Sequence, residues 1–145
     1  MTDVTRDMAV ESSIPRICHI DEAEVMGLDD ITRGLYGDIR YRAPEAVKGK
    51  PYNFKADVWS LGVILYFLFV GKLPFTISDD ISDYSDSESD QSTKNRIQLI
   101  EQKILNTEPD YALLSSKGFS EQAIDLIQKL LNKDPMTRLT VRAAL

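Results

Sequence analysis

The side chains that could do chemistry in this sequence are few, because its 145 residues hold one cysteine, one histidine and scattered carboxylates. Cys18 and His19 cannot build a zinc site of the Cys/His kind by themselves. A single thiol makes no internal disulfide and suits a reducing compartment, so we expect an intracellular, cytoplasmic protein. The net charge of −6 argues against nucleic-acid binding, which needs a basic face. The most apolar run, residues 58–70, is too short to span a membrane, and none is expected as a partner.

Four short segments carry patterns that are informative together. They are residues 41–45 (Y-R-A-P-E), 57–66 (D-V-W-S-L-G-V-I-L-Y), 71–75 (G-K-L-P-F) and 130–138 (L-L-N-K-D-P-M-T-R). In this order and spacing they resemble the C-terminal lobe of eukaryotic protein kinases, of the serine/threonine type and particularly the calcium/calmodulin-dependent kind. The resemblance covers roughly residues 14–145. It implies a family that uses ATP and magnesium to transfer the γ-phosphoryl group to serine or threonine of a protein substrate.

The resemblance implies a charge pair between Glu45, which closes the A-P-E motif, and Arg138. The pair would staple the activation segment, residues 21–45, to the last helices, because a guanidinium can meet a carboxylate in two bonds. Removing one partner of a buried pair typically costs about 3–5 kcal/mol. The alternative interpretation, two unrelated surface charges, is worth about 0–1 kcal/mol.

Asp57 has two candidate roles. Its residue type favours an N-cap for a helix that begins at Val58. In the family, the matching aspartate also holds the backbone of the catalytic loop, and no such loop is found in this sequence.

Residues 21–23 (D-E-A) stand where the family carries D-F-G, because Asp21 precedes Ala43 by 22 positions. Asp21 is therefore a candidate residual magnesium ligand, with an inert loop aspartate as the alternative. The changes to Glu and Ala remove an apolar anchor and a flexible glycine. Asp38 is a second departure, because the family usually carries threonine there and a carboxylate would face the like charge of a catalytic aspartate.

Hydroxyl groups offer candidate phosphosites. Thr32 and Tyr36 lie in the activation-segment stretch, although exposed loop hydroxyls are common in any protein. Residues 78–93 hold six acidic residues and six serines without a basic residue. Such a tract cannot bury enough surface to order itself, so we expect an exposed, solvated insertion, although acidophilic kinases accept this composition.

Several parts needed for phosphoryl transfer are not found in the sequence. It has no G-x-G-x-x-G loop, no V-A-I-K-like segment and no H-R-D-x-x-x-x-N loop. His19-Ile20-Asp21 fails as H-R-D because Met26 stands where asparagine is needed. We therefore predict a chain that is inactive alone and has no small β lobe.

The elements that must position these residues are predicted to be mostly helical. Apolar spacing, caps and stops predict helices over 43–48, 58–70, 94–106, from Ser120 to the stop at Asp134-Pro135, and from Thr140 onward. Residues 14–20 are expected to form a short strand or extended segment, and residues 1–13 a loose leader. The expected fold is thus mostly α, a partial kinase-like C-lobe over 14–145 with a short N-terminal strand segment.

Three hypotheses describe the function. The first is a partial serine/threonine kinase domain, from a truncated or split gene. The second is a degenerate pseudokinase remnant that binds other proteins, and the residues at 21–23 and 38 favour it. The third, an unrelated helical interaction domain, is disfavoured by the four ordered motifs. The expected partner is a protein substrate or another binding protein.

Overall fold

The computed structural model describes residues 16, 23–27, 30–77 and 91–144. The predicted leader at 1–13 lies outside these residues, as do the predicted strand at 14–20, except Arg16, and most of the acidic insertion. The described residues are mostly helical, as predicted, and contain no β-strand beyond a single antiparallel bridge between Thr32 and Tyr52. The elements are η2 (Ile39–Tyr41), α2 (Pro44–Val47), α3 (Lys55–Val70), α4 (Gln91–Asn106), α5 (Tyr111–Ser116), α6 (Glu121–Leu130) and α7 (Val141–Ala144).

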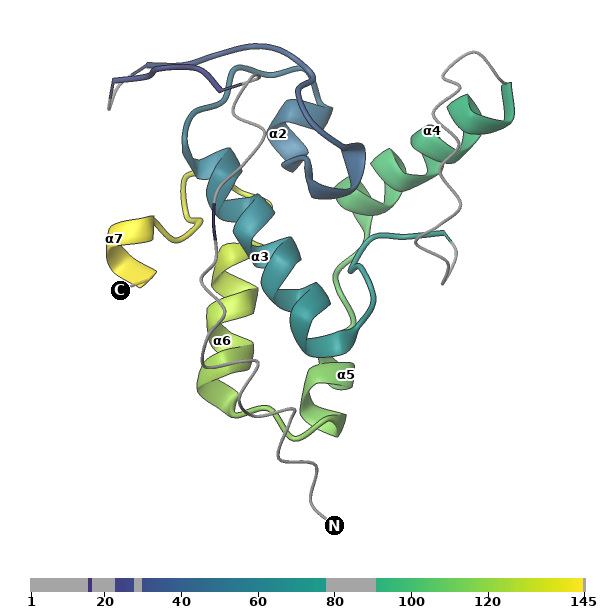
Figure 1. Cartoon of the computed structure of the whole chain (residues 1–145), viewed down its shortest axis with the longest axis vertical. Coiled ribbons are helices and arrows are strands. Elements are labelled where there is room, and N and C mark those ends of the chain that lie inside the picture. Colours follow the sequence, from purple (N-terminus) through teal and green to yellow (C-terminus); the bar gives the residue numbers. More distant parts are fainter. Residues whose placement is uncertain (1–15, 17–22, 28–29, 78–90, 145) are drawn as a thin grey trace.

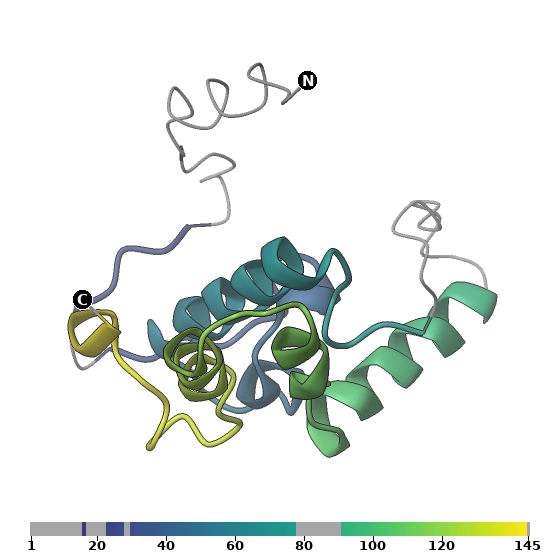
Figure 2. The same cartoon turned by 90° about the horizontal axis from the view of Figure 1, so that it is seen from below.

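Helix α3 is the centre of the fold. It lies beside α6 and also contacts η2 and α5, while α4 contacts η2 and α2 and its first turns extend outward (Figures 1 and 2). Trp59 of α3 is fully buried and stacks on Phe75, with ring centroids 5.5 Å apart. Buried side chains from the other helices complete the core, namely Ile100, Ile104, Leu114, Ile127 and Leu131. Burial of these large apolar side chains supplies most of the stabilisation of the lobe.

Helices α3 and α6 approach each other closely at Gly62. A Cβ placed on Gly62 would lie 2.9 Å from Leu130 Cβ and 2.9 Å from Leu131 Cδ2. Only a residue without a side chain fits at this spacing, so the glycine sets how deeply the two helices pack.

The start of α3 differs from the sequence-based prediction. The helix begins at Lys55, whose N–H donates to Asn53 Oδ1 at 3.1 Å, and Phe54 occupies the N-cap position without a side-chain bond. Asp57 therefore lies in the first turn, and the prediction that it caps the helix is wrong. Its negative charge still suits this end of the helix dipole. Gly71 ends the helix as predicted, with φ of +82° and its N–H donating to Phe67 O at 2.7 Å.

The later helices follow their local signals in part. Ser120 caps α6 as predicted, because its Oγ accepts from Ala123 N at 3.2 Å. Helix α4 begins at Gln91, three residues before the predicted start, so the end of the acidic tract is helical. Helix α5 was not predicted. It has six residues, and Asp110 caps it by accepting from Ala112 N at 3.1 Å.

Candidate functional site: the end of the activation segment

The structure brings Glu45 and Arg138 together, although 93 positions separate them in the sequence. The two guanidinium nitrogens donate to the two carboxylate oxygens at 2.6 Å and 2.8 Å. Both residues are buried, with 6% of Glu45 and 2% of Arg138 exposed. This two-bond geometry is the strong form of a carboxylate–guanidinium contact.

The Arg138 side chain also makes contacts with residues other than Glu45. Its Nε donates to Asn132 O at 2.8 Å, and one terminal nitrogen donates to Lys55 O at 2.9 Å. The guanidinium carbon lies 5.2 Å from the ring centroid of Trp59. A buried cation needs several partners to offset its lost hydration. One side chain thus joins α2, the start of α3 and the 132–138 segment.

Asp38 caps the short helix η2 and forms an ion pair with Arg40. Its Oδ1 accepts from Arg40 N at 2.9 Å, and its two oxygens accept from Arg40 Nε at 3.0 Å and 2.9 Å. Partial burial acts to raise the pKa of Asp38, but the hydrogen bonds and charge of Arg40, with the charge of Arg42, outweigh it and lower that pKa. The sequence predicted that a carboxylate at position 38 would face the like charge of a catalytic aspartate. In the structure the Asp38 carboxylate is paired with the guanidinium of Arg40, two residues away.

Arg42 holds the loop that precedes η2. Its NH2 group donates to Gly37 O at 2.7 Å and to Leu35 O at 3.1 Å, and its Nε donates to Tyr36 O at 3.4 Å. Neither this contact set nor the Asp38–Arg40 pair was predicted. The alternation of Asp38, Arg40 and Arg42 in the sequence is the signal that could have indicated them.

The two candidate phosphosites differ in their surroundings. The backbone of Thr32 is paired with Tyr52, with N···O distances of 2.8 Å and 3.0 Å, and its side chain is half-buried. Tyr36 lies in the loop held by Arg42, and 52% of it is exposed. Accessibility to a modifying enzyme therefore favours Tyr36 over Thr32.

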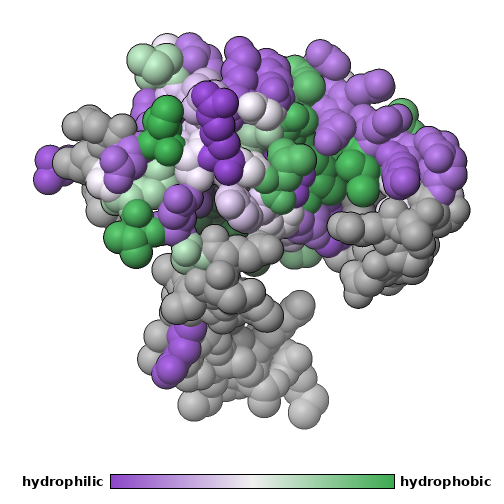
Figure 3. Space-filling model, turned by 90° about the horizontal axis from the view of Figure 1, so that it is seen from above, coloured by the Kyte–Doolittle hydropathy of each residue, from purple (hydrophilic) through white to green (hydrophobic). Residues whose placement is uncertain are grey.

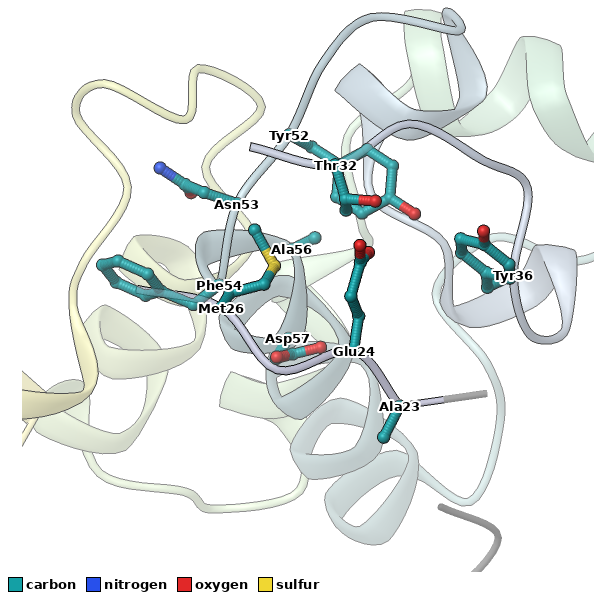
Figure 4. A pocket seen from close by; sticks show the side chains of 10 residues that line it. All are labelled: Ala23, Glu24, Met26, Thr32, Tyr36, Tyr52, Asn53, Phe54, Ala56 and Asp57. Atoms are coloured by element: carbon teal, nitrogen blue, oxygen red, sulfur yellow. The ribbon is translucent and has the colours of Figure 1, made fainter. Parts of the chain in front are cut away.

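A cavity of about 220 Å³ lies between the activation segment and the start of α3 (Figure 4). Its lining residues are Ala23, Glu24, Met26, Thr32, Tyr36, Tyr52, Asn53, Phe54, Ala56 and Asp57. Burial raises the pKa of the Asp57 carboxyl. Burial also raises the pKa of Tyr52, followed by the effects of Tyr36 and Glu24, while Arg42 opposes them. The cavity is thus acidic and hydroxyl-rich.

The phosphates of ATP do not fit the lining of this cavity well. The lining contains two carboxylates and no lysine, arginine or histidine, so its side chains offer like charge and no cation to a polyphosphate. Among the described residues, no group of three or more His, Cys, Asp or Glu side chains is placed to hold a metal ion. Asp21, the candidate magnesium ligand, lies outside the described residues.

Comparison of the sequence with known proteins identifies the family to which the chain is similar. Residues 9–145 match the family model of the protein kinase domain. The chain is 37% identical over 106 residues to calcium-dependent protein kinase 6 of Plasmodium berghei, covering 73% of this chain and 6% of that protein. It is 31% identical over 129 residues to serine/threonine-protein kinase dkf-2 of Caenorhabditis briggsae, covering 89% and 9%. It is 37% identical over 111 residues to serine/threonine-protein kinase PLK4 of Nematostella vectensis, covering 77% and 9%.

The alignments cover most of this chain but only a small part of each relative. Each covers more than two thirds of this chain, while the chain spans less than a tenth of each of these three relatives. In the described part of the chain, no helix is long and apolar enough to cross a bilayer. The family in general uses ATP and magnesium and acts on proteins. With the buried Glu45–Arg138 pair, the match over residues 9–145 shows that the chain belongs to the protein kinase domain family, of the serine/threonine type.

Proposed function

We propose that this chain forms the substrate-side helical lobe of a serine/threonine protein kinase domain. The observation that carries the proposal is the buried Glu45–Arg138 pair, which ties the end of the activation segment to the last helices. The contacts of Arg42 with the loop at 35–37 support it, because they fix the path of the segment just before the A-P-E motif. In this role the segment presents a preorganised surface to a protein substrate.

The 145 residues do not by themselves transfer phosphate in this proposal. Phosphoryl transfer needs a phosphate-covering loop, a lysine that contacts the phosphates and a positioned base, and the sequence contains no motif for any of them. The acidic cavity beside Asp57 supports the same view, because it offers no cation to a nucleotide.

The test is a transfer assay on the purified 145-residue chain. It is incubated with magnesium and ATP labelled at the γ-phosphate, with a basic protein and casein as substrates. We expect no incorporation above the level without protein, while an active serine/threonine kinase domain labels both substrates in parallel. Labelling that depends on the chain and is lost in Asp21→Asn would refute the proposal.

The second candidate function is a degenerate pseudokinase that binds another protein. The Asp38–Arg40 pair favours it, because the family's usual threonine is replaced and the new carboxylate is already engaged. The sequence of the transcript upstream of Met1 separates the two candidates. An open frame with H-R-D and a glycine-rich loop supports the split kinase, and an in-frame stop supports the remnant. In both cases we propose an intracellular location, as the single thiol suggests.

A further inference from the structure

The end of the activation segment and the turn after α2 are positively charged, although the chain as a whole is acidic. Residues 31–50 contain five basic and two acidic side chains, a net charge of +3, whereas the other residues contain 12 basic and 21 acidic side chains, a net charge of −9. One of the two carboxylates, that of Glu45, is already paired with Arg138 inside the lobe. The charge is therefore segregated, and this stretch can offer a local positive field on an anionic protein.

Three of the basic side chains in this stretch are exposed. They are Arg33, Lys48 and Lys50. Their side chains form no hydrogen bond or ion pair with any of the residues that the structure describes. The nearby carboxylates have other partners, because Asp30 accepts from Gly27 N at 2.6 Å and Asp38 is paired with Arg40. The three cations are therefore available to a ligand of opposite charge.

The backbone brings these cations to one edge of the lobe. Thr32 and Tyr52 exchange two hydrogen bonds, with N···O distances of 2.8 Å and 3.0 Å, so their two stretches run antiparallel. Arg33 follows Thr32 directly and Lys50 lies two residues before Tyr52, so these two cations are on paired stretches about 5 Å apart. Lys48 lies two residues before Lys50, at the C-terminal end of α2. We call the three cations the basic edge.

The basic edge lies beside the surface that the proposed function assigns to the substrate. The activation segment and the stretch from α2 to α3 lie together at the top of Figure 1, and Figure 3 looks onto this end from above. Many hydrophilic side chains gather there among smaller apolar groups. Arg33 precedes by two residues the loop at 35–37, whose path is fixed by Arg42. A ligand on the basic edge would therefore be next to this loop.

We propose that the basic edge binds an acidic segment of the protein substrate, next to the serine or threonine that is modified. This inference rests on the proposed function and adds the substrate class. Lysine and arginine pair with carboxylates, and the guanidinium of Arg33 can form two bonds with one of them. Three cations suit a short acidic stretch. DNA carries one charge about every 1.7 Å along its axis, so it would extend from the basic edge onto a chain whose other residues have a net charge of −9.

The experiment measures peptide binding to the 145-residue chain by fluorescence anisotropy at low ionic strength. The probe is a labelled peptide with a serine flanked by aspartate and glutamate, and the comparison peptide has asparagine and glutamine in their place. We expect binding of the acidic probe only. An exposed ion pair is worth a factor of about 1.4 to 5 in affinity. The triple variant Arg33→Gln, Lys48→Gln, Lys50→Gln should therefore bind the probe about 3-fold to 100-fold more weakly than wild type.

The matched control is a second triple variant, Lys94→Gln, Lys117→Gln, Arg142→Gln. It removes three cations that are also exposed but lie on other elements, so both variants have a net charge of −9 instead of −6. We expect the control to bind the probe much as wild type does. Both variants should keep the circular dichroism spectrum and urea midpoint of wild type, because none of the six side chains forms a hydrogen bond or ion pair with the described residues. A loss confined to the first variant is then a loss of binding and not of folding.

Several results would overturn the proposal. The first is a wild-type chain that does not bind the acidic probe. The second is an equal loss of binding in both triple variants, which would show that affinity follows net charge and not the basic edge. The third is single-stranded DNA that binds as tightly as the acidic probe, which would make the edge a general polyanion surface. An affinity that does not fall as ionic strength rises would also contradict it, because salt screens exposed charges. Each of these results leaves the phosphate-transfer test of the proposed function unchanged, so the two can fail separately.

Discussion

Replacing Glu45 with glutamine keeps the shape of the side chain and removes the charge that neutralises Arg138. The Arg138 side chain is 0% exposed and that of Glu45 is 6% exposed, so water cannot take the place of the lost carboxylate. Breaking a buried pair in this way costs about 3–5 kcal/mol. For a domain of this size, about 1 kcal/mol shifts the melting temperature by roughly 2–4 °C, so we expect a fall of roughly 6–20 °C.

The assays are urea denaturation, which gives the free energy of unfolding, and thermal denaturation, which gives the melting temperature; both are followed by circular dichroism, with Asp125→Asn as the control. Asp125 and Lys129 form an ion pair with the same 2.6 Å distance, but both side chains are more than half exposed. An exposed pair of this kind is worth about 0.3–0.5 kcal/mol. If Glu45→Gln changes the free energy of unfolding as little as Asp125→Asn does, the pair does not staple the segment and the reasoning fails. In a double-mutant cycle with Arg138→Met, the two losses should be clearly less than additive.

Three further predictions follow from the packing and the charges. Gly62→Ala should destabilise the fold by about 1–3 kcal/mol, because its Cβ would lie 2.9 Å from Leu130 Cβ; an unchanged urea midpoint would contradict this. The lowered pKa of Asp38 means that its ionised form stabilises the folded state above the unfolded pKa, and this contribution is lost as pH falls through the folded pKa. The difference in stability between wild type and Asp38→Asn should therefore be largest above pH 3.8, the ordinary pKa of the carboxyl group, and should disappear only at lower pH, as pH falls through the lowered pKa; a constant difference across pH would contradict this. Arg42→Gln should speed amide hydrogen exchange at residues 35–37, with α6 as the internal reference, because three carbonyl contacts are lost. Exchange at residues 35–37 that is as slow in the variant as in wild type would contradict this.

Local signals in the sequence predicted the features that depend on one or two residues. Gly71 ends α3 because a glycine adopts its left-handed conformation at little cost, and Ser120 caps α6 through its own hydroxyl. The start of α3 was missed because Asn53, two residues before Lys55, binds the first free N–H and no apolar period marks it. Helix α5 has six residues, which are too few for a helical repeat of apolar residues to be recognised in the sequence.

Local sequence patterns could not predict the features that depend on how distant segments of the chain meet in the fold. The Glu45–Arg138 contact was expected through the family resemblance, because no rule of spacing links residues 93 positions apart. The bonds from Arg42 to three carbonyl groups depend on how the loop at 35–37 turns back toward η2. The same holds for the acidic cavity, whose walls come from three separate stretches of the chain.

The position of Trp59 gives the protein an internal optical reporter. It is the one tryptophan in the sequence, and its ring contacts both the Phe75 ring and the guanidinium of Arg138 and has no exposed surface. Its fluorescence should therefore respond when the guanidinium moves, and not only when the whole lobe unfolds. Emission that changes before the circular dichroism signal during denaturation would show the junction of α2, α3 and the 132–138 segment loosening ahead of the helices. The ordering of these two events can thus be followed in unlabelled protein.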